Sequence, residues 1–185
     1  MDAELVRDVA LATAGLITHS LGGPGVIPPV PQNVLDFNFF YPDYWKPALG
    51  SFDAPNGDLS CARRLRSNTP LAALTGLNEP VFVEAARALA LRTLREGGDD
   101  AARVERAFLL CTSRPPSADE KRELLAFLAA QRKRIADGWL DAREISAGDP
   151  DALPALPAGT TPQDAAAWTL VSRVLLNLDE TITKN

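Results

Sequence analysis

The sequence predicts a mainly α-helical protein made of one domain. Apolar residues recur at helical spacing along most of the chain, and clear helix start signals precede these stretches. No stretch has the strict alternation of apolar and polar residues that is typical of a half-buried strand. The 185 residues are enough for one domain with a proper core and few for two. We therefore expect a single helical domain over 1–185, with about six helices.

The first predicted helix covers 1–18. Leu5, Val9, Ala12 and Leu16 lie on one face of it at helical spacing, and Val6 widens this apolar stripe. The glycines and the proline that follow Leu21 end the helix.

A long irregular layer is expected over 19–67. It contains 5 Gly and 7 Pro, which exclude a long regular element. Half of the chain's aromatic residues nevertheless lie within 37–45, whereas disordered segments are poor in aromatic residues. We therefore expect this layer to pack on the helices.

The helical core is expected over 68–185, where five further helices begin at recognisable signals. Asn68 or Thr69 is the predicted N-cap of a helix led by Pro70, and Asn78-Glu79-Pro80 restarts the chain. The remaining three helices begin after Asp99 or Asp100, at the capping box Ser117-Ala118-Asp119-Glu120, and at Thr161-Pro162. Their predicted buried faces are Leu71, Leu74 and Leu77; Phe82, Ala85, Ala86, Leu89 and Thr93; Val104, Ala107, Phe108 and Cys111; Leu124, Leu125, Leu128 and Ile135; and Ala165, Trp168, Val171, Leu175, Leu178 and Ile182. A second irregular stretch, 138–161, precedes the last helix, which is expected to run to Ile182. The residues expected to have structural roles are Asn68, Thr69, Pro70, Asn78, Trp168, Asn177 and Asp179.

Composition excludes several classes of function. The net charge of −5 argues against a general binder of nucleic acid or of anionic membranes. No apolar run approaches the ~20 residues of a membrane span. Two cysteines and one histidine cannot supply the four ligands of a usual structural zinc site, and no Cys-x-x-Cys-His haem motif is present. We therefore expect no metal and no cofactor in this chain. Its acidic start also predicts that it carries no signal peptide.

No complete catalytic motif stands out. The stretch around Ser20 lacks the first glycine of the serine-hydrolase elbow, and its neighbour His19 is expected to cap a helix end. Asp53-Ala-Pro-Asn-Gly-Asp58 lacks the ligand spacing of a calcium loop, and its Asn-Gly predicts a tight turn. Asp53 or Asp58 could pair with a further carboxylate, Asp36 or Asp43, as the acid and base of a glycosidase, which sequence alone leaves open.

The candidate anion-binding or substrate-binding site combines Asp53 and Asp58 with Arg63, Arg64 and Arg66. Guanidinium groups suit phosphate, sulfate or carboxylate. In the alternative interpretation these arginines pair with the acidic surplus of the chain and anchor the irregular layer to the helices.

Several segments in a fixed order resemble the domain of unknown function 1553 family, the C-terminal domain of large planctomycete-type proteins. They are Ser51-Phe-Asp-Ala-Pro-Asn-Gly-Asp58, Cys61-Ala-Arg-Arg64, Arg66-Ser-Asn-Thr-Pro-Leu71, Leu77-Asn-Glu-Pro-Val-Phe-Val-Glu-Ala-Ala-Arg87, Arg114-Pro-Pro-Ser117, and Trp168 with Val174-Leu-Leu-Asn-Leu-Asp-Glu180. Between Ala48 and Phe52 the chain is shorter than the family pattern, which usually has an Arg- and aromatic-rich stretch there. The resemblance therefore describes a short or internally deleted member.

The resemblance also implies a cellular context. In that family the domain usually follows a signal peptide, c-type cytochrome-like modules and a sister domain. We therefore expect an exported, periplasmic protein of which this chain is a C-terminal piece. Its partners would be upstream domains of the same polypeptide or their cytochrome-like modules.

The function that we expect is a non-catalytic interaction or scaffolding module of such a cytochrome-c-associated protein. The first alternative is a module of an enzyme that acts on complex or sulfated polysaccharides, with its site between Asp53 and Arg66. A weaker alternative is an electron-transfer surface for the haem modules. Convergence of the five candidate side chains in a pocket favours the enzyme, whereas their burial as internal salt bridges favours the scaffold.

The two cysteines are expected to remain unlinked thiols. Export would permit a disulfide between Cys61 and Cys111. However, Cys111 lies on the apolar face of a predicted helix, while Cys61 lies beside three arginines in the irregular layer. A buried and an exposed cysteine rarely approach closely enough to form a disulfide.

Overall fold

The described part of the chain is helical. The computed structural model describes residues 1–18, 22, 47–55, 61–147 and 156–183. No strand occurs within these ranges, so the predicted mainly α-helical class is confirmed. None of the helices described is long and apolar enough to cross a membrane. His19, the aromatic cluster of 37–45 and Asp58 lie outside the described residues.

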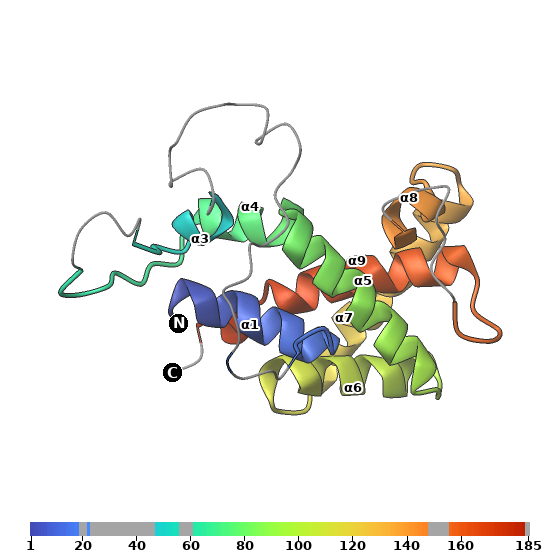
Figure 1. Cartoon of the computed structure of the whole chain (residues 1–185). Helices are drawn as coiled ribbons and strands as arrows, with labels where there is room; N and C mark the ends of the chain where they lie inside the picture. Colours follow the sequence, from blue (N-terminus) through green and yellow to red (C-terminus); the bar gives the residue numbers. More distant parts are fainter. Residues whose placement is uncertain (19–21, 23–46, 56–60, 148–155, 184–185) are drawn as a thin grey trace, which may run out of the picture.

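The helices follow one another in the order shown in Figure 1. They are α1 (Ala3–Ala14), α3 (Pro47–Gly50), α4 (Pro70–Asn78), α5 (Pro80–Arg95), α6 (Asp100–Thr112), α7 (Ala118–Ala136), α8 (Ala142–Ala147), α9 (Pro162–Leu176) and α10 (Asp179–Ile182). Helices α1, α4, α5, α6 and α7 correspond to the first five predicted helices, and α9 and α10 together cover the sixth. Helices α3 and α8 are short additions.

Helix α9 is the central element of the core. It packs against α5, α7 and α8, while α1 packs against α5 and α6 packs against α7 (Figure 1). Its buried residues cover most of its circumference, as expected for a helix surrounded by others. They are Ala165, Ala166, Ala167, Trp168, Thr169, Val171, Ser172, Leu175 and Leu176. The many alanines of α9 and α5 allow the two helices to approach closely.

Side-chain caps begin the helices where the sequence predicts them. The hydroxyl of Thr69 accepts a hydrogen bond from the backbone N–H of Ala72 at 3.1 Å, with Pro70 in the first turn. Asp99, rather than Asp100, caps α6. Ser117 and Glu120 form the full capping box of α7. These bonds satisfy backbone donors that a helix N-terminus leaves without intrahelical partners.

The N-terminal helix is shorter than predicted, and a different face of it is buried. It ends at Ala14 because Gly15 takes the left-handed conformation, with φ of 77°, and closes the helix end. Its buried face contains Ala3, Val6, Ala10, Thr13 and Ala14, whereas Leu5 and Leu16 are exposed. The small residues allow α1 to lie close to α5, so the predicted stripe through Leu5 and Leu16 was wrong.

The predicted buried face of α4 was also wrong. Leu71 and Leu74 are exposed, and Ala72 is the buried residue of this helix. Helix α4 packs on α5 and α9. Its small residues face α9, because Ala73 and Gly76 both lie against Asn177 at the end of that helix.

The C-terminal segment is interrupted where one continuous helix was predicted. Helix α9 ends at Leu176 with Asn177 as its C-cap, and α10 begins after Leu178. The hydroxyl of Thr181 donates a hydrogen bond at 2.9 Å to the carbonyl oxygen of Leu175 and so closes the break.

In the stretch 138–161, which was predicted to be irregular, Asp141 accepts a hydrogen bond from the backbone N–H of Arg143 at the start of α8. Asp141 was the start signal for α8 that the sequence reading missed.

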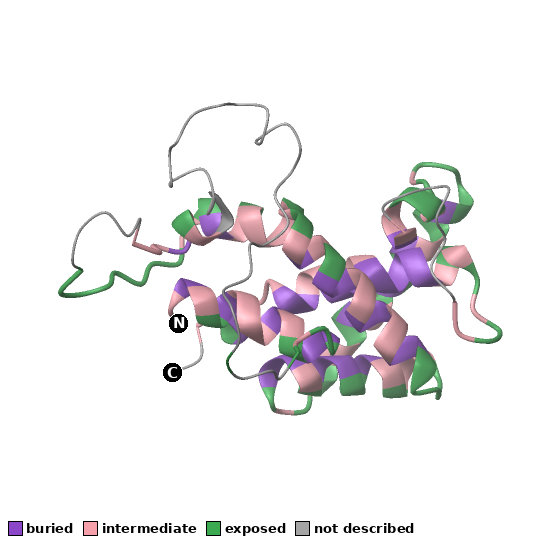
Figure 2. Ribbon diagram, in the orientation of Figure 1, coloured by how far each residue is buried: buried purple, intermediate pink, exposed green. Residues whose placement is uncertain are grey.

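Within the predicted irregular layer, an aromatic pair fastens the residues after α3 to the core. Phe52 is buried, and its ring centroid lies 5.8 Å from that of Phe82 on α5, with the rings at 60°. Edge-to-face geometry of this kind favours aromatic pairs. By contrast, 61–68 is exposed along its whole length (Figure 2).

Candidate functional site

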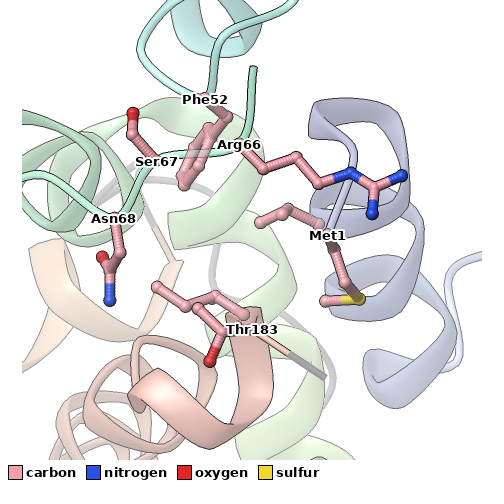
Figure 3. Close-up of a pocket in the computed structure, with 8 residues that line it drawn as sticks. Met1, Phe52, Arg66, Ser67, Asn68 and Thr183 are labelled. Carbon is pink, nitrogen blue, oxygen red and sulfur yellow. The ribbon is translucent and has the colours of Figure 1, made fainter. Parts of the chain in front are cut away.

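A pocket of about 360 Å³ lies between α1, the segment before α4 and the end of α10 (Figure 3). Its lining residues are Met1, Val6, Phe52, Arg66, Ser67, Asn68, Ile182 and Thr183. Figure 3 shows Arg66 reaching from its segment towards α1, above Met1. The pocket therefore adjoins the arginine cluster that the sequence singles out.

Two of the three arginines are paired with the start of α1. Arg66 contacts the carboxylate of Asp2 at 2.7 Å, and Arg64 contacts that of Glu4 at 2.8 Å. Carboxylates at a helix N-terminus are favoured by the helix dipole. Here they also hold residues 61–68, which we call the arginine segment. These pairs are what the anchoring interpretation expects.

Arg63, Arg64 and Arg66 also border an open hollow of about 610 Å³ together with Asp2 and Leu65. Unlike Arg64 and Arg66, the Arg63 side chain makes no hydrogen bond or ion pair with any residue that the structure describes. Anion binding at this surface stays a prediction.

Asp53 turns towards Ser67 rather than towards an arginine. One of its carboxylate oxygens accepts hydrogen bonds from the backbone N–H and from the hydroxyl of Ser67, both at 2.6 Å. Asp53 itself has a φ of 61°, a conformation that non-glycine residues rarely adopt. Asp53, Arg64 and Arg66 are therefore engaged in contacts that fasten the segment, at the surface rather than in a buried site.

The next residues of the segment reach two other helices. Asn68 donates a hydrogen bond to the carboxylate of Asp179 in the first turn of α10. That carboxylate also accepts a hydrogen bond from Thr183 at 3.2 Å. The sequence left open whether Asn68 or Thr69 is the N-cap of α4, and the structure shows that it is Thr69. Asn68 instead makes this tertiary contact with Asp179.

The end of α9 is held against α4 by further residues expected to have structural roles. The side-chain amide of Asn177 donates to the carbonyl oxygen of Ala73 at 3.1 Å. Arg173 donates to the carbonyl oxygen of Leu77, and Asn78 donates to that of Leu74 at 2.9 Å. These side chains satisfy carbonyl groups in the last turn of α4.

Trp168 lies in the middle of the core and is fully buried. Within the described structure its indole N–H has no hydrogen-bond partner. Its role is therefore the filling of space between α9 and its neighbours.

Sequence reading missed the strongest ionic cluster. Arg114, for which no ionic contact was predicted, makes paired hydrogen bonds to Glu120 at 2.7 and 2.9 Å and also contacts Glu180 at 2.7 Å. The guanidinium lies 4.9 Å from the ring centroid of Phe108. Its hydrogen bonds, with help from Ser117, lower the pKa of Glu120 to about 2, and the two carboxylates raise the pKa of Arg114. The acidic residue of the capping box was the available signal.

The described residues contain no group of three or more His, Cys, Asp or Glu side chains that could hold a metal ion. The expectation that this chain carries no metal or cofactor stays a prediction.

Fold and contacts together define a helical domain in which an arginine segment joins the ends of α1, α4 and α10. The family described as "Protein of unknown function (DUF1553)" matches residues 1–128, and the chain belongs to this family. The match includes the arginine segment and Arg114, while Trp168, Asn177 and Asp179 lie beyond it. No curated protein matches the chain, and no solved structure does.

Proposed function

We propose that this chain is a non-catalytic interaction module. The observation that carries the proposal is the exposure of two leucines of α4, which we call the leucine face: Leu71 at 62% and Leu74 at 57%. Leu65, in the segment before this helix, is 73% exposed. Leu71 and Leu74 are three residues apart on α4 and so lie on one side of this helix. Grouped exposed apolar side chains are a feature of protein–protein contact sites.

The surrounding contacts support a rigid binding surface rather than a reactive one. Arg64 and Arg66 form ion pairs with carboxylates at the start of α1, and Asp53 accepts hydrogen bonds from Ser67. The segment that carries Leu65 is thereby held to α1 and to Asp53, and it leads directly into α4. A surface that is held in place before binding loses little conformational entropy when a partner docks.

The proposed partner is a preceding domain of the same polypeptide, in an exported cytochrome-c-associated protein. The resemblance supports this partner, and Arg63 beside the exposed Leu65 favours a partner surface that has acidic as well as apolar groups. The alternative proposal is a polysaccharide-active enzyme. Asp53, one of the carboxylates named for it, is engaged by Ser67, which favours the interaction module.

Calorimetric titration of this chain with the separately expressed preceding domain tests the proposal. We expect binding that Leu71→Ser/Leu74→Ser weakens at least about thirtyfold, as truncation of central interface residues does. The matched control is Leu109→Ser, which removes a 40% exposed leucine from α6. Circular dichroism of each variant checks folding. Absence of binding, or equal weakening by the control, would overturn the proposal. Release of reducing ends from a sulfated polysaccharide by the isolated chain would favour the enzyme instead.

A further inference from the structure

A second pocket, of about 410 Å³, lies between α5, α8 and α9, away from the leucine face. Its polar lining comes from Arg87 on α5, Arg173 on α9 and Glu144 on α8, and Trp139 forms part of its wall. Helix α8 lies at the opposite end of the molecule from the N-terminus of α1 (Figure 1). The volume is within the range of small-ligand sites.

Both guanidinium groups are held by hydrogen bonds to backbone carbonyl oxygens, and each retains N–H donors for a ligand. Arg87 donates from Nε to the carbonyl oxygen of Ile145 at 2.8 Å and from Nη2 to that of Glu144 at 3.1 Å. Arg173 donates from Nε and Nη2 at the end of α4. Among the hydrogen bonds of the described residues, none uses Nη1 of either guanidinium.

The positive charges of this pair are not neutralised by a salt bridge within the described part of the chain. Among the described residues, no carboxylate forms an ion pair with Arg87 or Arg173. Partial burial and the neighbouring Arg173 lower the pKa of Arg87, while Glu84 and Glu144 act in the opposite direction. Two guanidinium groups that repel each other at a pocket wall are matched by an oxyanion, which can accept hydrogen bonds from both.

Trp139 provides a flat apolar surface beside these donors. It is 76% exposed, although its backbone N–H is held by the carbonyl oxygen of Arg134 at 3.0 Å. An indole that lines a pocket and is left open to solvent is suited to stacking against a ring of a ligand.

Acidic groups next to the arginines restrict the charge of that ligand. Asp141 uses a carboxylate oxygen to cap α8, and the carboxylate of Glu144 makes no hydrogen bond among those of the described residues. Glu144 can therefore accept hydrogen bonds from hydroxyl groups. A group that concentrates several negative charges, such as the triphosphate of a nucleotide, would be repelled by these carboxylates, whereas a ring that carries one negative charge and several hydroxyl groups matches the mixture.

We propose that this pocket binds an acidic sugar residue of an oligosaccharide. Its oxyanion, a carboxylate or a sulfate ester, lies between Arg87 and Arg173. The sugar ring lies against the indole of Trp139, and its hydroxyl groups donate to Glu144. This site is separate from the leucine face, so either proposal can fail alone.

Isothermal titration of the full chain tests the site with defined probes. They are a hexasaccharide of galacturonic acid, a carrageenan hexasaccharide that carries sulfate esters, neutral maltohexaose, inorganic sulfate and ATP. We expect one or both acidic hexasaccharides to bind at least about tenfold more tightly than maltohexaose, with an affinity that falls as salt is added. The two acidic probes distinguish a carboxylate from a sulfate ligand.

Three variants locate the binding. Trp139→Ala, at an exposed position, and Arg87→Lys, which keeps the charge but loses the planar fork, should each weaken binding about tenfold. Arg143→Gln is the matched control, because it removes an exposed arginine of α8 that does not line the pocket. The proposal is overturned by equal binding of neutral and acidic probes or by tighter binding of ATP. Unchanged affinity in Trp139→Ala, or equal loss in Arg143→Gln, also overturns it.

Discussion

An ideal Cβ atom on Gly76 would lie 2.5 Å from Oδ1 of Asn177, closer than real contacts allow. The Asn177 side chain has little room to move away, because its amide nitrogen is bonded to the carbonyl oxygen of Ala73. Helix α4 can therefore lie against the end of α9 only with glycine at this position.

We expect Gly76→Ala to lower the free energy of unfolding by about 1–3 kcal/mol through overpacking, despite the gain in helix propensity. Urea denaturation measures this change. Gly50→Ala is the control, because an added Cβ there meets nothing within 4 Å. A Gly76→Ala protein as stable as the parent would show that Asn177 yields at no cost.

The Thr69 cap and the Asn68–Asp179 contact should be separable. Thr69→Ala is expected to cost about 1 kcal/mol, whereas Thr69→Ser keeps the hydroxyl and should cost less. Asn68→Ala and Asp179→Ala should couple in a double-mutant cycle, because they remove the same hydrogen bond. Thermal and urea unfolding of the single and double variants measure both effects. Strict additivity of the second pair would contradict the contact.

Local signals predicted the fold well because their partners are close in sequence. The Thr69 cap and the Ser117–Glu120 box each join residues three positions apart. The buried faces of α5 and α6 also agree with the predictions from helical spacing. The errors at Leu71 and Leu74 have one cause: helical spacing identifies an apolar face, but not whether a neighbouring helix covers it.

The candidate site was only partly predictable. Its charge complementarity was visible, since an arginine cluster in an acidic chain needs partners. The particular partners were not, because Arg66–Asp2 and Asn68–Asp179 join residues 64 and 111 positions apart. Likewise, the pocket at Trp139 depends on the placement of α8, a helix that the sequence reading did not detect.

Glu120 should make stability depend on pH in the acid range. Its folded pKa of about 2 lies below the ordinary 4.5, so its contribution is present above about 4.5 and is lost as pH falls towards 2. We expect Glu120→Gln to be less stable than the parent at pH 7 and the difference to disappear near pH 2. Urea unfolding at several pH values measures it. Glu123→Gln, which loses only an exposed contact with Arg122, should show no such convergence.

The two cysteines should differ sharply in reactivity. Cys61 is exposed on the arginine segment, whereas Cys111 is buried in α6 beside Phe108. A thiol reagent that reaches only the surface should label Cys61 in the native protein, and both residues should be labelled in denaturant without reductant. Mass spectrometry counts the labels, and Cys61→Ser, which should show no native labelling, assigns them. If neither residue is labelled in denaturant until reductant is added, the two sulfurs are joined. The helical core around Cys111 must then open to reach the exposed segment, contrary to this structure.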